Sequence, residues 1–374
     1  MREPARGRAA FRCCRPARTS RRCPLRAACA AAENRHFGHQ WGDPQQELSK
    51  GWQNADVSTE DDRVDVRGVA SFVAIAYVPA WLLTLPLWLT GEGLSWNWAP
   101  LVLTVMMFMP AVAALVVNKW ISPRPKLLRT LGITNPGGIK KWWPYVLIAW
   151  LGPPLVMALA LLVGYLLGVY QADWTGFSGL AEQAGPTVVG SAPQTPPGML
   201  ALIQIAMVFG LGWLQIIPAL GEELGWRGYL TQALLPLGQP GAFVTTGVLW
   251  GLWHVPVLIL GYNYPTLPIV VAVIMMVCFC TLVGTLLGWL RLVSRSVWPS
   301  TIAHGFLNAA AGLGTVFSMA GHPVDNASVG LLGWTGWIVL VLLILVLVML
   351  GKLPMQFPAE TVGITRGVNR RTRR

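Results

Sequence analysis

Eight long apolar runs constrain the fold more than any other feature of this sequence. Each run has 20 or more residues and few charges. A helix of about 20 apolar residues crosses the hydrocarbon core of a bilayer and satisfies its own backbone hydrogen bonds. We therefore predict an all-α fold, a polytopic membrane helix bundle with about eight transmembrane helices. The runs lie at approximately 69–90, 98–118, 142–170, 198–220, 241–260, 267–290, 298–317 and 330–350.

Composition supports this class and locates the charge. Charged residues are 12% of the chain and hydrophobic residues 54%, whereas about 25% of an ordinary soluble domain is charged. A soluble globular chain and a disordered chain are therefore both disfavoured. The net charge of +12 comes from two tails, since residues 1–35 hold ten Arg against two Glu and residues 352–374 hold six basic residues against one Glu.

We predict three parts from this distribution. Residues 1–67 are a basic N-terminal tail and linker that we expect to be disordered, 68–351 the membrane domain, and 352–374 a basic C-terminal tail. We expect the tails to be solvated or to face lipid headgroups. No fold signature of a nucleic-acid-binding protein accompanies them, so nucleic acid is not an expected partner.

Basic residues occur only in alternate connections between the runs. Cytoplasmic loops of membrane proteins are enriched in Lys and Arg. Both 119–141 and 291–297 carry such residues, and 221–240 carries Arg227. With eight spans, these connections and both tails fall on one side, so we predict cytoplasmic termini. The alternate connections contain no Lys or Arg: 91–97, 171–197, 261–266 and 318–329.

Two smaller features concern local structure. The stretch 171–197 is rich in Gly, Pro, Ser and Thr, which predicts a flexible external loop. The pairs Gly247–Gly251 and Gly284–Gly288 have the small-xxx-small spacing that lets membrane helices approach closely.

An acidic pair follows the fourth apolar run. Glu222 and Glu223 precede Arg227, and an ionisable group inside a membrane usually has a partner and a purpose. On a helix, Glu223 and Arg227 share a face, whereas Glu222 is turned about 100° away. The spacing predicts one carboxylate held by a cation and one left free for general-base chemistry. Taken alone, the pair could equally be a surface ion pair at a cytoplasmic helix end.

Two histidines lie inside apolar runs. His254 follows Trp250 by four residues, and His304 precedes Asn308 by four, so His304 and Asn308 share a helix face. Counted from the start of its run, His254 is about 20 Å deep at 1.5 Å per residue. His304 is only six residues into its run. The two histidines can meet only if their helices begin at different depths.

These side chains are the parts needed to cleave a peptide bond with water. A carboxylate takes a proton from water, and a histidine orients that water or shuttles the proton. A second histidine and an amide N–H can stabilise the charge that develops on the carbonyl oxygen. The chain has no recognisable nucleophile motif and no HExxH, which favours direct attack by water over an acyl-enzyme.

In this order, the residues resemble the CPBP family, which comprises type II CAAX prenyl endopeptidases and bacteriocin-processing enzymes. The family pattern is EExxxR, then an aromatic residue four before a His, then HxxxN or HxxxD, each on a separate membrane helix. The aromatic residue is often Phe in the family and is Trp here. The resemblance covers residues of about 200–315. The sequence matches the pattern at Glu222-Glu223-xxx-Arg227, Trp250-xxx-His254 and His304-xxx-Asn308.

The resemblance implies an eight-helix intramembrane endopeptidase whose cavity opens toward the cytoplasm. Glu222 would be the general base, His254 would help to activate the water, and His304 and Asn308 would form the oxyanion site. Two further residues would support the cluster by pairing and orientation: Glu223 and Arg227.

Two mechanisms fit these residues. We favour a metal-free glutamate mechanism, with no required cofactor. The alternative is a zinc site whose ligands are Glu222, His254 and His304, because two His and one Glu form a known catalytic zinc set.

The expected partners are the lipid bilayer and a membrane-embedded or lipidated peptide or protein substrate. We predict peptide hydrolysis and not CAAX processing in particular, in a multi-pass protein of the cell membrane. Two other classes stay open. One is a proton-coupled transporter, which predicts inverted repeats. The other is a non-catalytic membrane immunity or scaffold protein of the same fold.

Overall fold

Helices make up the regular structure of the part of the chain that the computed structural model describes. That part is residues 63–134, 139–189 and 195–353, and it contains no β-strand. One isolated antiparallel bridge joins Ala172 and Ser318. The tails predicted at 1–67 and 352–374 lie outside the described residues, except for 63–67 and 352–353.

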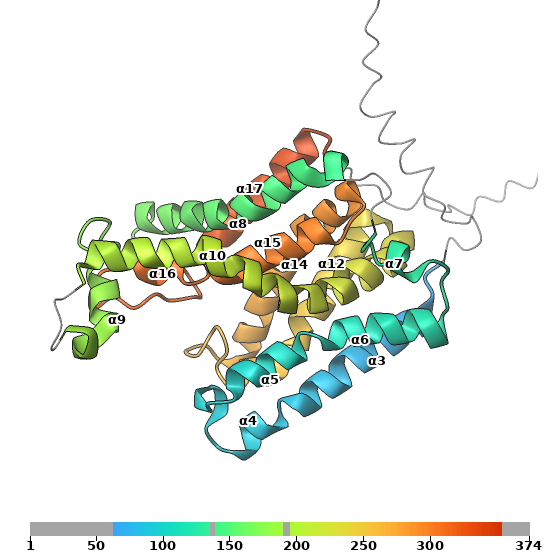
Figure 1. Ribbon diagram of the computed structural model, residues 1–374, viewed down its shortest axis with the longest axis horizontal. Coiled ribbons are helices and arrows are strands. Elements are labelled where there is room, and N and C mark those ends of the chain that lie inside the picture. Colours follow the sequence, from blue (N-terminus) through green and yellow to red (C-terminus); the bar gives the residue numbers. More distant parts are fainter. Residues whose placement is uncertain (1–62, 135–138, 190–194, 354–374) are drawn as a thin grey trace, which may run out of the picture. The chain divides into compact units, whose positions relative to one another are not determined.

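The helices that form most of each predicted apolar run appear in Figure 1. They are α3 (Val66–Leu83), α4 (Leu85–Leu89), α5 (Ala99–Met106), α6 (Met109–Val116), α8 (Ile139–Leu166), α10 (Pro197–Glu223), α12 (Gly238–Trp253), α14 (Ile269–Ser294), α15 (Trp298–Ala310) and α17 (Trp334–Met349). The connecting elements are η1 (Gly93–Ser95), η2 (Val117–Ile121), α7 (Leu127–Thr130), α9 (Ser178–Val189), η3 (Leu224–Leu230), α11 (Thr231–Leu234), η4 (Leu235–Leu237), α13 (Val255–Leu258) and α16 (Leu313–Val316).

Among the described residues, five helical segments are long and apolar enough to cross a membrane. One of them, Pro197–Trp253, has 57 residues and covers two of the predicted runs. The last two runs form α15, with 13 residues, and α17, with 16 residues. The all-helical class is confirmed, while the number of eight spans stays a prediction. Helix α15 packs against α10, α8 and α14, so neighbouring helices rather than lipid cover much of its surface.

Beyond α10 the chain continues through the π-helix η3 and then α11, which agrees with the helical stretch that the sequence predicts at Leu224–Leu235 within the connection 221–240. One segment predicted as a flexible loop is partly helical instead: the stretch 171–197 contains α9. Leu180 of α9 packs against Ala201 and Val316, and this tertiary packing outweighs the weak local helix propensity of the segment.

The connecting loops gather at two ends of the helix bundle. At one end, the Val297 amide donates to the Gly132 carbonyl (2.9 Å), and Arg291 Nη2 donates to the Thr130 carbonyl (3.2 Å). We call this the basic end; it comprises 122–133 and 295–297. At the other, the Asp173 amide donates to the Phe317 carbonyl (2.9 Å). We call this the acidic end; it comprises 167–177, 261–268 and 311–333, which contain no Lys or Arg.

The predicted alternation of basic connections therefore matches the spatial arrangement of these loops. Arg227 is the exception, because it is fully buried within η3 and is not a loop residue. Which end faces the cytoplasm stays a prediction.

Helices α12 and α14 approach closely at the predicted glycines. A Cβ atom on Gly251 would lie 2.6 Å from Val277 Cα, and one on Gly288 would lie 2.5 Å from the Phe243 ring. The Val277 backbone cannot move aside for such a Cβ atom as the end of a flexible side chain could. Gly251 is therefore required by the contact between the two helices.

We predict that Gly251→Ala destabilises the protein by about 1–3 kcal/mol, the usual effect of overpacking. The measurement is the apparent melting temperature of the purified protein in detergent. Gly210→Ala is the matched control, because a Cβ there meets nothing within 4 Å on the exposed face of α10. Equal melting temperatures for the two variants would contradict the close helix contact.

Candidate active site

A buried carboxylate joins η3 to α15. Glu223 Oε1 accepts a hydrogen bond from Arg227 Nη1 at 2.7 Å and another from His304 Nδ1 at 2.9 Å. The exposed fractions are 0% for Glu223, 0% for Arg227 and 3% for His304. The predicted pairing of Glu223 with Arg227 is present. The surface ion pair considered above is wrong, because both partners are fully buried.

Arg227 has a second partner in α12. Its guanidinium lies 4.2 Å from the centroid of the Trp250 ring. The face of an indole ring is negative and attracts a cation, most strongly where water is excluded. Arg227 Nε and Nη2 are buried without a hydrogen-bond partner among the described residues. Glu223 and the Trp250 ring therefore provide the compensation for this buried charge.

Glu222 faces the other way, as its position on the helix predicts. Its Oε2 accepts a hydrogen bond from Trp250 Nε1 at 2.6 Å and one from Trp226 Nε1 at 3.3 Å. The residue is 3% exposed. The prediction of a free carboxylate was wrong in this respect, because two indole N–H groups hold it. Both donors reach the same oxygen.

The hydrogen bond to Glu223 orients His304. A carboxylate only accepts, so Nδ1 of His304 carries a proton in this contact and Nε2 is left for other partners. The imidazole also lies 5.3 Å from the Trp250 ring, at 67° to it. The ring is therefore held from two sides.

His254 occupies the break between α12 and α13. Its Nδ1 lies 2.9 Å from the Trp250 carbonyl oxygen, so Nδ1 donates and Nε2 is left as the free ring nitrogen. The ring of Tyr262 is nearly parallel to that of His254, with centroids 6.4 Å apart. Pro256 follows the break and cannot donate a helical hydrogen bond, which explains why α12 ends here.

The two histidines lie on either side of Trp250. The Trp250 ring lies 5.3 Å from His304 and 6.2 Å from His254, and its N–H reaches Glu222. Helix α12 begins at Gly238, directly after η4, whereas α15 begins only six residues before His304. The stagger that the sequence required is therefore present.

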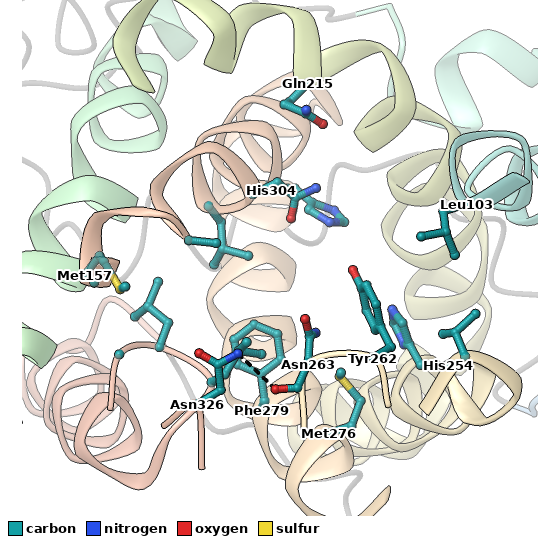
Figure 2. Close-up of a pocket in the computed structure, with 18 of the residues that line it drawn as sticks. Leu103, Met157, Gln215, His254, Tyr262, Asn263, Met276, Phe279, His304 and Asn326 are labelled. Atoms are coloured by element: carbon teal, nitrogen blue, oxygen red, sulfur yellow. Dashed lines mark hydrogen bonds between the residues drawn. The ribbon is translucent and has the colours of Figure 1, made fainter. Parts of the chain in front are cut away.

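Four of the six predicted residues line one cavity of about 520 Å³ (Figure 2). Glu222, His254, His304 and Asn308 line it. Figure 2 shows His254 and Tyr262 side by side on one wall and His304 on another. Glu223 does not line the cavity but is hydrogen-bonded to His304, which does. Arg227 is one step farther away, because it is bonded to Glu223.

Three residues of this site had no role assigned from the sequence, although Trp250 was noted as the aromatic residue of its motif. Trp226 and Trp250 hold Glu222, and the signal was available, because an indole N–H buried in a membrane needs an acceptor. Tyr262 gave no signal, since it lies in a connection. Burial, followed by the charge of Glu222, raises the pKa of Tyr262 to about 12. Its phenol therefore keeps its proton at neutral pH and can donate a hydrogen bond.

The donor groups do not gather as a metal site. Among the residues that the structure describes, no three His, Cys, Asp or Glu side chains lie close enough together to hold a metal ion. Glu222, His254 and His304 border the same cavity but do not form such a group, and one oxygen of Glu222 is already bound by two donors. The arrangement does not fit the zinc alternative.

Comparison with known proteins identifies the segment that carries this site. Residues 195–310 match the family model for type II CAAX prenyl endopeptidases, described as Rce1-like. This segment is similar to that family, and the match does not extend to the rest of the chain. All six predicted site residues lie within the matched segment, and the resemblance over about 200–315 is confirmed. A search of curated proteins finds no match to the chain.

The apolar helices among the described residues fit a membrane protein, and the segment that carries the cavity is similar to a family of endopeptidases. The family match accounts for the order of the motifs. The geometry adds that the three motif-bearing helices bring their polar side chains to one cavity.

We predict that Arg227→Met lowers the free energy of unfolding by about 3–5 kcal/mol, because it leaves the Glu223 carboxylate buried without its cation. Thermal unfolding in detergent would measure this loss. Arg129→Met is the matched control, since Arg129 is exposed at the basic end. If both variants unfold at the parental temperature, Arg227 does not stabilise the fold through this pair.

Proposed function

We propose that this protein is an intramembrane endopeptidase that hydrolyses a peptide bond of a membrane-embedded or lipidated substrate with activated water. The observation that carries the proposal is the convergence of Glu222, His254 and His304 from three helices on one cavity. The similarity to the endopeptidase family supports the reaction class.

Glu222 is the proposed general base. The indoles of Trp226 and Trp250 fix one carboxylate oxygen, which leaves the other to accept the proton of a water molecule. His254 assists through Nε2, because its Nδ1 is already held by the Trp250 carbonyl. A positioned base of this kind contributes typically about 100- to 10,000-fold in rate.

His304 and Asn308 are the proposed oxyanion site. They are four residues apart on α15 and both line the cavity. Glu223 accepts from His304 Nδ1, and the proposed donor to the oxyanion is Nε2, which carries a proton when both ring nitrogens do. The Asn308 amide supplies the second donor. Glu223 and Arg227 act as positioning residues, since neither borders the cavity.

The proposed reaction balances without a cofactor. The water oxygen bonds to the scissile carbonyl carbon while Glu222 takes a proton from it. The tetrahedral intermediate then collapses, the C–N bond breaks, and Glu222 returns the proton to the leaving amine. No step requires a metal ion, so we favour the metal-free mechanism.

The two alternatives have less support. A proton-coupled transporter requires ionisable groups that exchange partners, whereas Glu223 is buried and bound by both Arg227 and His304. A non-catalytic scaffold has no need for a cavity bordered by a carboxylate and two imidazoles. Plasma-membrane localisation is part of the proposal, and a prenylated substrate is not.

We predict that Glu222→Gln abolishes hydrolysis while the fold is retained. The amide oxygen can still accept from Trp226 and Trp250, but the side chain can no longer take a proton. His254→Ala and His304→Ala should each lower the rate by about 100- to 1000-fold, the usual effect of removing one catalytic donor. The measurement is cleavage of a fluorogenic lipopeptide library by purified protein. Parental rates in these variants would overturn the catalytic assignment.

We also predict that hydrolysis survives complete removal of divalent metal. The assay compares the protein before and after exhaustive chelation, with metal content checked by elemental analysis. Loss of activity that added zinc restores would contradict the metal-free mechanism.

A further inference from the structure

Four titratable side chains line the cavity in the part of the chain that the structure describes, and the proposed reaction uses three of them. They are Glu222, His254, His304 and Tyr262. Tyr262 is the one to which that reaction gives no role. Figure 2 shows its phenol oxygen pointing into the cavity, with the His254 ring beside it and His304 across from it. The hydroxyl can therefore meet a molecule that occupies the cavity.

The turn that carries Tyr262 is anchored on both sides. The Tyr262 amide donates to the Val257 carbonyl at 3.0 Å, and the Asn326 amide donates to the Asn263 carbonyl at 2.9 Å (Figure 2). The planes of the Tyr262 and His254 rings differ by only 6°. A hydrogen-bond donor is most effective in catalysis when it is positioned before charge develops on the substrate. The anchored phenol of Tyr262 meets this condition.

The phenol of Tyr262 is a donor that does not depend on the charge of the histidines. Burial, followed by the charge of Glu222, raises its pKa to about 12, and a hydrogen bond from the Asn263 side chain is a smaller, opposing effect. That bond lowers the pKa because it is donated to the phenol oxygen, so the O–H proton is directed to a different acceptor. His304 Nε2 donates only when both ring nitrogens carry a proton, whereas the phenol donates in either state of His304.

Several other donors of the lining are engaged or exposed. The Trp253 N–H donates to the Ala76 carbonyl at 3.1 Å. Gln215, in the middle of α10, and Gln183 of α9 both line the cavity but are exposed. Their amides are screened by the surroundings, and electrostatic stabilisation is weaker where screening is strong. Tyr262 is better placed than these three to stabilise a developing charge.

We propose that Tyr262 is a catalytic residue whose hydroxyl donates a hydrogen bond to the oxyanion of the tetrahedral intermediate, together with His304 and Asn308. This inference rests on the proposed function. The donors then come from two elements, α15 and the turn 261–264. The phenol keeps its proton throughout, while Glu222 delivers a proton to the leaving amine as described above. The hydrogen bond strengthens as charge develops on the oxygen, so it lowers the barrier more than it improves substrate binding.

Tyr262→Phe tests the hydroxyl alone, because the ring beside His254 is kept. We predict that kcat for a fluorogenic lipopeptide falls about 100- to 1000-fold, the usual effect of removing one oxyanion donor, while KM changes little. A peptide phosphinate has a tetrahedral, anionic group that resembles the intermediate, so the variant should bind it more weakly by a similar factor. An unchanged kcat, or a rise in KM alone, would overturn the inference.

Tyr264→Phe is the matched control. Tyr264 is 2% exposed and its hydroxyl donates to the Leu332 carbonyl at 3.0 Å, but it does not line the cavity. Loss of this buried hydrogen bond should lower the apparent melting temperature in detergent, whereas kcat and the affinity for the phosphinate should stay parental. If both variants lose activity in proportion to their loss of stability, Tyr262 only holds its turn, and the catalytic assignment is wrong.

The parent protein separates this inference from the proposed function. If the parent cleaves no peptide in detergent and binds no phosphinate, the proposed function fails and the role of Tyr262 fails with it. If the parent cleaves the peptide and Tyr262→Phe cleaves it at the same rate, the role of Tyr262 alone is wrong. A fall in kcat confined to Tyr262→Phe, with a matching loss of phosphinate affinity, supports both.

Discussion

The buried contact between Glu223, Arg227 and His304 organises this protein. A charge in a low-dielectric interior is tolerated only with close partners, and here those partners come from η3 and α15. The Arg227 guanidinium also covers the Trp250 ring of α12. One set of interactions therefore fixes the three segments that carry the polar motifs. Their relative positions cannot shift without exposing a charge to the apolar interior.

Trp250 connects this supporting layer to the cavity. Its ring faces Arg227 and His304, its N–H binds Glu222, and its carbonyl accepts from His254. A rigid side chain with one donor suits this position, because it loses little rotamer entropy on burial. A phenylalanine, frequent at this position in the family, has no N–H to offer Glu222. The second donor, Trp226, comes from the π-helix η3, an element often found at functional sites.

The two ends of the bundle differ in a way that matters for chemistry in a membrane. At the basic end, packed aromatic rings keep Glu222 from water. Toward the acidic end, amide side chains border the cavity and can solvate both water and a peptide backbone. Hydrolysis needs water and a low dielectric at the same place. A cavity closed on one side and polar on the other meets both needs.

The sequence by itself determined the helical class, the two-ended distribution of loop charge and the helix faces on which Glu223 meets Arg227 and His304 joins Asn308. These follow from run length and from a period of 3.6 residues, which are local properties. Only the tertiary structure decided the stagger of α12 against α15, the helix α9 in a predicted loop, and the two indoles on Glu222. It also placed Tyr262 and Asn263 beside the cavity. Such features depend on packing between residues distant in the chain, and no local pattern records how far one helix slides along another.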